Sequence, residues 1–416
     1  MDRKNFMGFG FGPIQAGLML YEATRSNNFK SCMVAEIDQD LVDRVRRNNN
    51  SIVVNIARTN GIEKAVLSGI AIYNPQVPGD REEIAKAVRE ADELATAVPG
   101  VSLYEAGGRS SIADLLAENI DPLRPRILYA AENNNYAAEI LKESLLKRTE
   151  IERLKSLQIL NTVIGKMSGT IQGAEEIGTL GLEPITPGFP RAYLVEEFNR
   201  ILVSRVRLPG VVRGITVFQE KEDLLPYEEA KLFGHNAIHA VLGYLAHRKG
   251  YTTMNEIGND GALFSFGCDT LIEESGAMLI RKYRSIQDPL FTESGFRDYA
   301  QDLIRRIVNP YLNDRVLRIC RDPVRKLGYG DRLVGTMREA LKQGITPRRL
   351  ALGAFAALEF IIKEKVSLGV PIPEKPQDLD ERGVRRMLHA IWAGEEMDGY
   401  RDTCLDLVAE AGKTRE

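Results

Sequence analysis

The sequence predicts an α/β domain with a mainly parallel sheet, followed by a mainly α-helical domain. Two observations carry this prediction. In the N-terminal part, short apolar runs alternate with amphipathic stretches, the pattern of strands connected by helices. After the proline-rich segment 184–190, long amphipathic stretches with helical periodicity dominate. We therefore place the domain boundary at this segment, with an α/β domain at 1–190 and a helical domain at 191–416.

Short apolar or alternating runs predict the strands of the first domain. They lie at residues 5–9, 31–36, 51–57, 69–73, 93–98, 126–131 and 157–164. Helical patterns fall between several of them, at residues 17–24, 40–48, 81–90, 111–119 and 135–147. This alternation favours a parallel sheet that is covered on both faces.

The second domain is predicted to consist of helices. Helical patterns occur at residues 226–249, 269–284, 296–307, 331–343 and 350–366. The segment 369–376 contains three prolines and reads as a linker before a last helical segment. No repeat or low-complexity stretch is visible.

The composition excludes several classes of protein. With 55 basic and 58 acidic residues the net charge is -3, so there is no large basic field for nucleic acid. The four cysteines have no short spacing, which argues against a disulfide framework or a zinc site and suits a reducing compartment. No stretch of about 20 apolar residues predicts a membrane span, and no signal peptide is recognised. We expect a cytoplasmic protein without a metal.

A glycine-rich loop follows the first predicted strand. In Gly10-Phe-Gly12-Pro-Ile14-Gln15-Ala-Gly17, the first two glycines suit a tight turn and close approach to a pyrophosphate at a helix N-terminus. Gln15 occupies the usual position of the third glycine, so an ordinary strand–helix turn is an alternative. Glu36, at the end of the second strand, is an acid placed to accept the ribose hydroxyls of NAD, with Asp38 as a competitor. Together these features predict a Rossmann-like, NAD-binding domain.

The predicted helix 226–249 carries three different polar groups. On an α-helix, Lys231, His239 and Asn236 would project at roughly 0°, 80° and 140° around the axis. A desolvated lysine can accept an alcohol proton, an asparagine amide can stabilise an alkoxide, and a histidine can orient a hydroxyl. The alternative is a solvated lysine and a core histidine. His235 lies on nearly the same face, so spacing alone does not choose between the two histidines.

The pattern Lys231-x4-Asn236-x2-His239 resembles the signature of the polyol-specific long-chain dehydrogenases, the mannitol dehydrogenase family. The surrounding segment is most similar to the branch that acts on mannitol 1-phosphate. Further similar segments are Glu273–Tyr283, Asn309-Pro-Tyr-Leu-Asn-Asp314, Arg321–Leu327 and Asp331-Arg-Leu, with weaker matches at Phe9–Gly12, Thr96–Val98 and Ala131–Asn133. The resemblance covers roughly residues 5–340, most densely from 225 to 335.

The resemblance implies metal-independent hydride transfer between NAD(H) and a polyol–ketose pair, with mannitol 1-phosphate and fructose 6-phosphate as the best single guess. It implies Lys231 as general base, Asn236 and Asn133 as donors to the alkoxide, and His239 as substrate ligand. The cofactor segments would include Gly10, Gly12, Ile14, Glu36, Thr96 and Val98. From the residues alone, Asn133 reads as a turn or a helix cap.

A cationic cluster and one departure from the family bear on the substrate. Arg321, Arg325 and Lys326 could bind a substrate phosphate, although a solvated helix end or ion pairs would explain them equally well. Where the branch has an Asn-x-x-x-Asp-Arg segment, this chain has Asn161-Thr-Val-Ile-Gly165-Lys166. An expected acid is therefore a glycine, which leaves the substrate open.

Two alternatives to a polyol dehydrogenase remain. One is reduction of a hexuronate by the same groups. The other is an inactive NAD-binding sensor, against which the retention of Lys231, Asn236 and His239 argues. The histidine and cysteine spacings disfavour a zinc alcohol dehydrogenase. We expect a small-molecule polyol or sugar phosphate as partner, no nucleic acid or membrane partner, and a monomer or homodimer.

Overall fold

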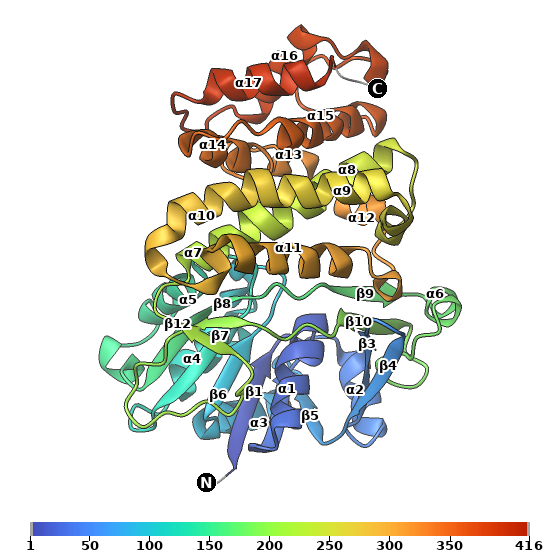
Figure 1. Cartoon of the computed structure of the whole chain (residues 1–416). Helices are drawn as coiled ribbons and strands as arrows, with labels where there is room; N and C mark the ends of the chain where they lie inside the picture. Colours follow the sequence, from blue (N-terminus) through green and yellow to red (C-terminus); the bar gives the residue numbers. More distant parts are fainter. Residues whose placement is uncertain (1–2, 414–416) are drawn as a thin grey trace. The chain divides into compact units, whose positions relative to one another are not determined.

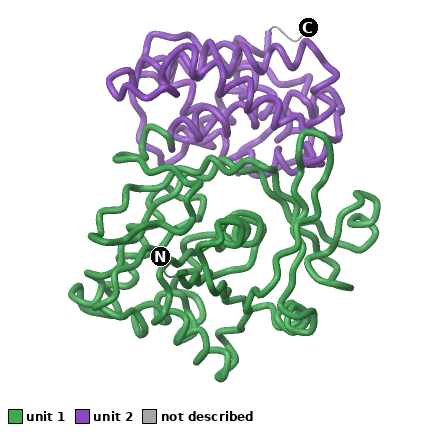
Figure 2. Tube along the Cα trace, turned by 60° about the horizontal axis from the view of Figure 1, so that its bottom comes forward, with its two compact units in different colours: residues 1–227 green, residues 228–416 purple. Residues whose placement is uncertain are grey.

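The chain divides into two compact units (Figure 2), in a computed structural model that describes residues 3–413. Unit 1 is Met1–Tyr227 and unit 2 is Glu228–Glu416. The boundary therefore lies after Tyr227 and not at residue 190 as the proline-rich segment suggested. The reason is that residues 191–227 contribute strands that pair with earlier strands of unit 1.

The main sheet of unit 1 has the strand order β12-β11-β8-β7-β6-β1-β2-β5. All pairs from β5 to β8 are parallel, and only β11 runs antiparallel to its neighbour β8. The predicted mainly parallel sheet is therefore confirmed. Its strands are β1 (Lys4–Phe9), β2 (Phe29–Ala35), β5 (Ile70–Tyr73), β6 (Glu93–Thr96), β7 (Arg126–Ala130), β8 (Leu157–Val163), β11 (Leu202–Ser204) and β12 (Gln219–Lys221).

The central strand β1 contributes to the apolar core on each face of this sheet, because successive side chains of a strand point to opposite faces. Phe6 packs into one core, whereas Met7 and Phe9 pack into the other. The core of Met7 and Phe9 is covered by α3 (Pro78–Glu90), α4 (Ile112–Asn119) and α5 (Ala137–Leu146) (Figure 1). The core of Phe6 includes the helix after the glycine loop and residues of a second sheet.

The second sheet has the order β4-β3-β10-β9. The strand predicted at 51–57 forms here as β3 (Ile52–Ala57) and does not join the main sheet. Its partners β4 (Ile62–Leu67), β9 (Ser168–Gln172) and β10 (Arg191–Glu196) were not predicted. Unit 1 also contains the π-helix η1 (Gln15–Leu20), the α-helices α1 (Tyr21–Ser26), α2 (Gln39–Arg47) and α6 (Ala174–Thr179), and three short 3-10 helices, η2 (Val101–Tyr104), η3 (Gly108–Ser110) and η4 (Ile151–Leu154).

Unit 2 is helical, as predicted. The first helical run is formed by α7 (Leu225–Glu229), which spans the unit boundary, the π-helix η5 (Ala230–Asn236) and α8 (Ala237–Arg248). The second run is formed by α9 (Gly261–Asp269), the π-helix η7 (Thr270–Gly276) and α10 (Ala277–Tyr283). The other α-helices described in unit 2 are α11 (Glu293–Ile307), α12 (Val316–Ile319), α13 (Pro323–Lys326), α14 (Val334–Lys342), α15 (Arg348–Lys363), α16 (Glu381–Ile391) and α17 (Arg401–Ala411).

Glycines let the helices of unit 2 approach closely around α8. A Cβ atom on Gly353 of α15 would lie 2.6 Å from the Val241 side chain, and one on Gly243 would lie 2.5 Å from Ile319. Both distances are shorter than a carbon–carbon contact allows, so these crossings require glycine. Within residues 3–413 no helix is both long and apolar enough to cross a membrane.

Candidate active site

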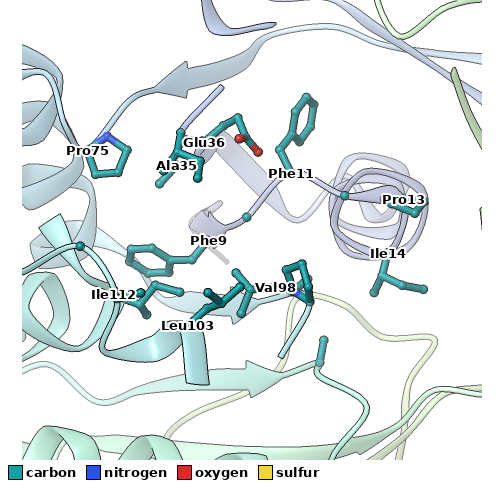
Figure 3. Close-up of a pocket in the computed structure, with 18 of the residues that line it drawn as sticks. Phe9, Phe11, Pro13, Ile14, Ala35, Glu36, Pro75, Val98, Leu103 and Ile112 are labelled. Carbon is teal, nitrogen blue, oxygen red and sulfur yellow. The ribbon is translucent and has the colours of Figure 1, made fainter. Parts of the chain in front are cut away.

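A cavity of about 730 Å³ opens in unit 1 where the strand order reverses. The chain runs from β1 to β2 on one side and later returns to β6 on the other, which leaves a crevice beyond the carboxyl ends of these strands. Residues after β1 and after β6 line the cavity, including Gly10, Gly12 and Val98. In Figure 3, Glu36 and Phe11 lie on one side, and Val98, Leu103 and Ile112 lie on the opposite side.

The glycine loop has the backbone geometry expected of a pyrophosphate site. Gly10 has a φ of +80°, and a Cβ atom there would lie 2.7 Å from the Ala97 carbonyl oxygen, so only glycine fits. A Cβ atom on Gly12 would meet nothing within 4 Å, which leaves its backbone open on the cavity side. Ile14 also lines the cavity, and the hydroxyl of Tyr193 donates to the Phe11 carbonyl oxygen and fixes the loop.

Gln15 occupies the position of the usual third glycine, and a glycine in strand β1 makes room for its side chain. Its buried side chain packs against Gly8 of β1, where a Cβ atom would lie 2.0 Å from the Gln15 amide nitrogen. Gly17 has a separate function, because its Cβ atom would lie 2.6 Å from Val195 of β10. Close packing of the helix is therefore preserved by two glycines outside the usual position.

The two acids after β2 have different surroundings. Glu36 lines the cavity, and one of its carboxylate oxygens accepts a bond of 2.8 Å from the Asp38 backbone N–H. Asp38 caps α2 by accepting from Leu41 N and forms an ion pair of 3.3 Å with Arg191. Asp38 thus has local structural partners, whereas Glu36 is the acid of the cavity. Arg191, from β10, also lines the cavity and was not anticipated from the sequence.

Glu132 organises the other wall and was not anticipated either. Its carboxylate accepts from Val98 N at 3.0 Å, from the Thr96 hydroxyl at 2.9 Å and from the Tyr104 hydroxyl. Burial raises the pKa of this carboxyl, although the three donors oppose the shift. Thr96 is buried and does not line the cavity, and its side chain acts on the cavity wall through Glu132. Asn133, the next residue, does line the cavity.

In unit 2, the segment that carries Lys231 and Asn236 is a π-helix. The predicted helix at 226–249 forms, and Gly250 after its end has a φ of +81°. However, η5 spans Ala230–Asn236, and a π-turn pairs residue i with residue i+5. Asn236 therefore follows Lys231 by one hydrogen-bonded turn, closer in direction than the 140° expected for an α-helix. π-Helical turns occur often at functional sites.

Lys231 is half-buried in this segment. Burial, together with the nearby positive charge of Arg332, lowers the pKa of Lys231 to about 8, while Glu228 opposes the shift. At pH 7 a pKa near 8 leaves about 300 times more neutral amine than an ordinary lysine would have, since each pKa unit is a factor of ten. Lys231 is thus suited to accept a proton.

The structure distinguishes the two histidines. His235 is buried. Burial is the main reason that the pKa of His235 lies well below the ordinary value, and the positive charge of Arg306 acts in the same direction. His239 is more accessible, and its Nε2 lies 3.1 Å from Oδ2 of Asp314. Asp314 is buried and also pairs with Arg318 at 2.6 Å. The Asp314 pair favours a proton on Nε2 of His239, which leaves Nδ1 as an acceptor.

The predicted phosphate cluster is not assembled as a cationic surface. Lys326 is buried, and its ammonium donates to the carbonyl oxygens of Ile319 and Arg321. Arg325 is exposed and pairs with Asp331 at 3.2 Å. The Arg321 side chain donates to the Arg318 carbonyl at 3.3 Å. The three residues are close in sequence, but the Lys326 ammonium points inward.

Lys166, beside the glycine that replaces an expected acid, is also buried. Its ammonium donates to the Phe198 carbonyl oxygen at 2.9 Å. It lines a polar cavity in unit 1 together with Glu22, Arg25 and Arg58. Among residues 3–413, no group of three or more His, Cys, Asp or Glu side chains is arranged to hold a metal ion.

Comparisons with known proteins agree with these features. A family model described as "Mannitol dehydrogenase C-terminal domain" matches residues 223–385. A mannitol-1-phosphate 5-dehydrogenase from Brevibacillus brevis is 30% identical over 308 residues, 73% of each chain, and one from Caldanaerobacter subterraneus subsp. tengcongensis is 26% identical over 394 residues, 93% of each chain. The solved mannitol 2-dehydrogenase of Pseudomonas fluorescens, in complex with NAD and D-mannitol, has a TM-score of 0.68 at 15% identity and covers 99% of this chain and 92% of that one.

Proposed function

The chain belongs to the mannitol dehydrogenase family, and from this premise we propose that it oxidises a polyol or a polyol phosphate to the ketose with NAD and without a metal. It is an oxidoreductase of the polyol dehydrogenase type. The observation that carries the proposal is the half-buried Lys231, whose pKa of about 8 suits a general base, in the segment that the family model matches. Mannitol 1-phosphate, oxidised to fructose 6-phosphate, is the proposed substrate, and the cytoplasm the proposed location.

Unit 1 would hold the cofactor, and its residues fit NAD. Gly10, Gly12 and Ile14 would contact the pyrophosphate, because the Gly12 backbone is open to the cavity. The Glu36 carboxylate would accept the ribose hydroxyls, and its negative charge disfavours a 2′-phosphate. Val98 would line the nicotinamide side, with Thr96 as a positioning residue that acts through Glu132. When bound, NAD supplies the hydride acceptor.

Unit 2 would supply the proton chemistry. The neutral amine of Lys231 accepts the proton of the reacting hydroxyl. The Asn236 amide donates to the oxygen as negative charge develops on it. By its position in the family pattern, Asn133 is proposed for the same role. Nδ1 of His239, left as an acceptor by the Asp314 pair, takes a hydrogen bond from a substrate hydroxyl.

The proposal is tested with Lys231→Ala in a panel of polyols and polyol phosphates with NAD. We expect turnover by the wild type and its loss in the variant, with NADH binding, measured by fluorescence, retained. Lys249→Ala is the matched control, because this lysine follows the same helix but is exposed and pairs with Asp260. Near-normal turnover by Lys231→Ala would remove the lysine from the role of base.

Adding a hexuronate with NADH to this panel separates the alternatives. If the protein reduces the hexuronate and oxidises no polyol or polyol phosphate, the substrate is a sugar acid in place of the proposed one. NADH binding without turnover of any compound would identify a sensor and refute the enzymatic proposal.

A further inference from the structure

Arg332, which lies in the family-like segment Asp331-Arg-Leu and has no role assigned above, is fixed in unit 2 by a neighbouring carboxylate. Its Nε donates to Oδ1 of Asp331 at 2.7 Å, and its backbone N–H donates to the same oxygen at 2.6 Å. Only 13% of its side chain is exposed. The other oxygen of Asp331 pairs with Arg325 at 3.2 Å. One carboxylate therefore holds two guanidinium groups, one exposed and one largely enclosed.

The outer edge of the Arg332 guanidinium is available to a ligand. Within the part of the chain that the structure describes, the hydrogen bond of its side chain is made by Nε with Asp331, and its backbone carbonyl oxygen accepts from the Thr336 hydroxyl. The two terminal nitrogens of the guanidinium make no hydrogen bond within residues 3–413, and 13% of the side chain is exposed. Two parallel N–H donors on a fixed guanidinium match the oxygens of a phosphate or carboxylate.

Other cationic groups lie near Arg332, and acids offset part of their charge, since Glu228 raises the pKa of Lys231 and Arg306 pairs with Asp302. The charge of Arg332 contributes, after burial, to the lowered pKa of Lys231, and it acts on His235 in the same direction, as does Arg306. Asp331 offsets only part of this charge, since it is shared with Arg325. Holding like charges in a partly desolvated region costs free energy, which a bound anion would offset.

We propose that Arg332 binds an oxyanion group carried by the substrate, a phosphate ester or a carboxylate of the sugar chain. This proposal rests on the proposed function and assigns the anion subsite to Arg332, with Arg325 beside it, in place of the Arg321–Lys326 group. Lys326 is excluded because its ammonium is occupied by two backbone carbonyl oxygens. The substrate of this site is then an anionic sugar and not a free polyol.

The test compares Arg332→Gln with the wild type on fructose 6-phosphate and on free fructose, with NADH as reductant. We expect the KM for the phosphorylated ketose to rise about 10- to 100-fold, the range for losing a hydrogen bond to a charged group. The KM for NADH and the KM for free fructose should change little, whereas kcat should change by the same factor for both ketoses, because the charge of Arg332 also lowers the pKa of Lys231. Arg348→Gln is the matched control, since this side chain in the same unit is 74% exposed. Equal losses on both ketoses would overturn the proposal.

Further arms identify the anion. If the KM for a hexuronate rises in Arg332→Gln and no hexose phosphate is turned over, the group bound by Arg332 is a carboxylate. Arg332→Lys keeps the positive charge but loses the two parallel N–H donors of the guanidinium, so its KM for the phosphorylated ketose should lie between those of the wild type and Arg332→Gln. It replaces the glutamine variant in the test if that variant does not fold. If the wild type reduces no ketose, the proposed function fails, but calorimetry with inorganic phosphate still tests whether Arg332 binds an oxyanion. Binding that is lost in Arg332→Gln supports the subsite, and absent or unchanged binding refutes it.

Discussion

Replacing Lys231 by methionine should stabilise the protein while abolishing its activity. Lowering the pKa of Lys231 from 10.5 to about 8 means that the folded chain disfavours the ammonium form. At 1.36 kcal/mol per pKa unit, this shift of about 2.5 units corresponds to about 3 kcal/mol of lost stability at neutral pH. Methionine has a similar length and no charge, so the variant avoids this cost.

The stabilisation must depend on pH in a defined direction. Below pH 8 Lys231 is protonated in both the folded and the unfolded chain, and the full cost is present. Between pH 8 and 10.5 the unfolded chain binds more protons, so the stability of the wild type rises with pH. At pH 9.5 about 1 kcal/mol of the cost remains, since one pKa unit then separates the pH from the unfolded value. The advantage of Lys231→Met should therefore shrink by half or more between pH 6.5 and 9.5.

Thermal unfolding at these two pH values is a suitable assay. For a unit of this size each kcal/mol shifts Tm by about 2–4 °C, so an increase of several degrees is expected at pH 6.5. Lys249→Met is the control, because a hydrogen bond to Asp260 raises the pKa of this exposed lysine and its loss should not stabilise. A change in Tm for Lys231→Met that is independent of pH, or a lower Tm at both values, would refute the reasoning.

Two more substitutions test individual contacts. Glu36→Ser should raise the KM for NAD about tenfold, because the carboxylate that accepts the ribose hydroxyls is lost. The preference for NAD over NADP should also become smaller, since the carboxylate no longer repels the 2′-phosphate. An unchanged KM and kcat with both cofactors would exclude this role of Glu36. Asp314→Asn should lower kcat/KM for the polyol about 10- to 100-fold with NADH affinity retained, since His239 loses its charged partner. Asp314→Glu should restore part of the activity, whereas a loss traced wholly to a lower Tm would indicate a structural role only.

The sequence predicted elements more accurately than it predicted their partners. The strand at 51–57 was expected and forms, yet it pairs with β4 and β10 in a second sheet. Strand pairing is set by contacts between distant residues, and a local pattern does not reveal it. The strand β10 was missed because the prolines that precede it suggested a boundary.

The site shows the same limit. The family pattern identified Lys231, Asn236 and His239, but ideal α-helical spacing did not anticipate the π-helix η5, which packs against η7. Asp314 lay within a quoted segment without a role, because its contact with His239 is made only in three dimensions. For the cations, proximity in sequence favoured Lys326, whose ammonium points inward, over Arg332.

The packing of Gln15 on Gly8 makes these two positions interdependent. Any side chain at residue 8 collides with the glutamine, whereas Gln15→Gly alone removes a side chain that fills the core and leaves a void beside β1. Each single exchange is therefore costly, and the reciprocal double exchange is the tolerated route. Among related chains we expect reciprocal occupancy, with a glycine at one of the two positions and a larger residue at the other. A glutamine in this loop thus predicts a glycine in the strand before it, and a search for the usual three-glycine pattern would overlook such chains.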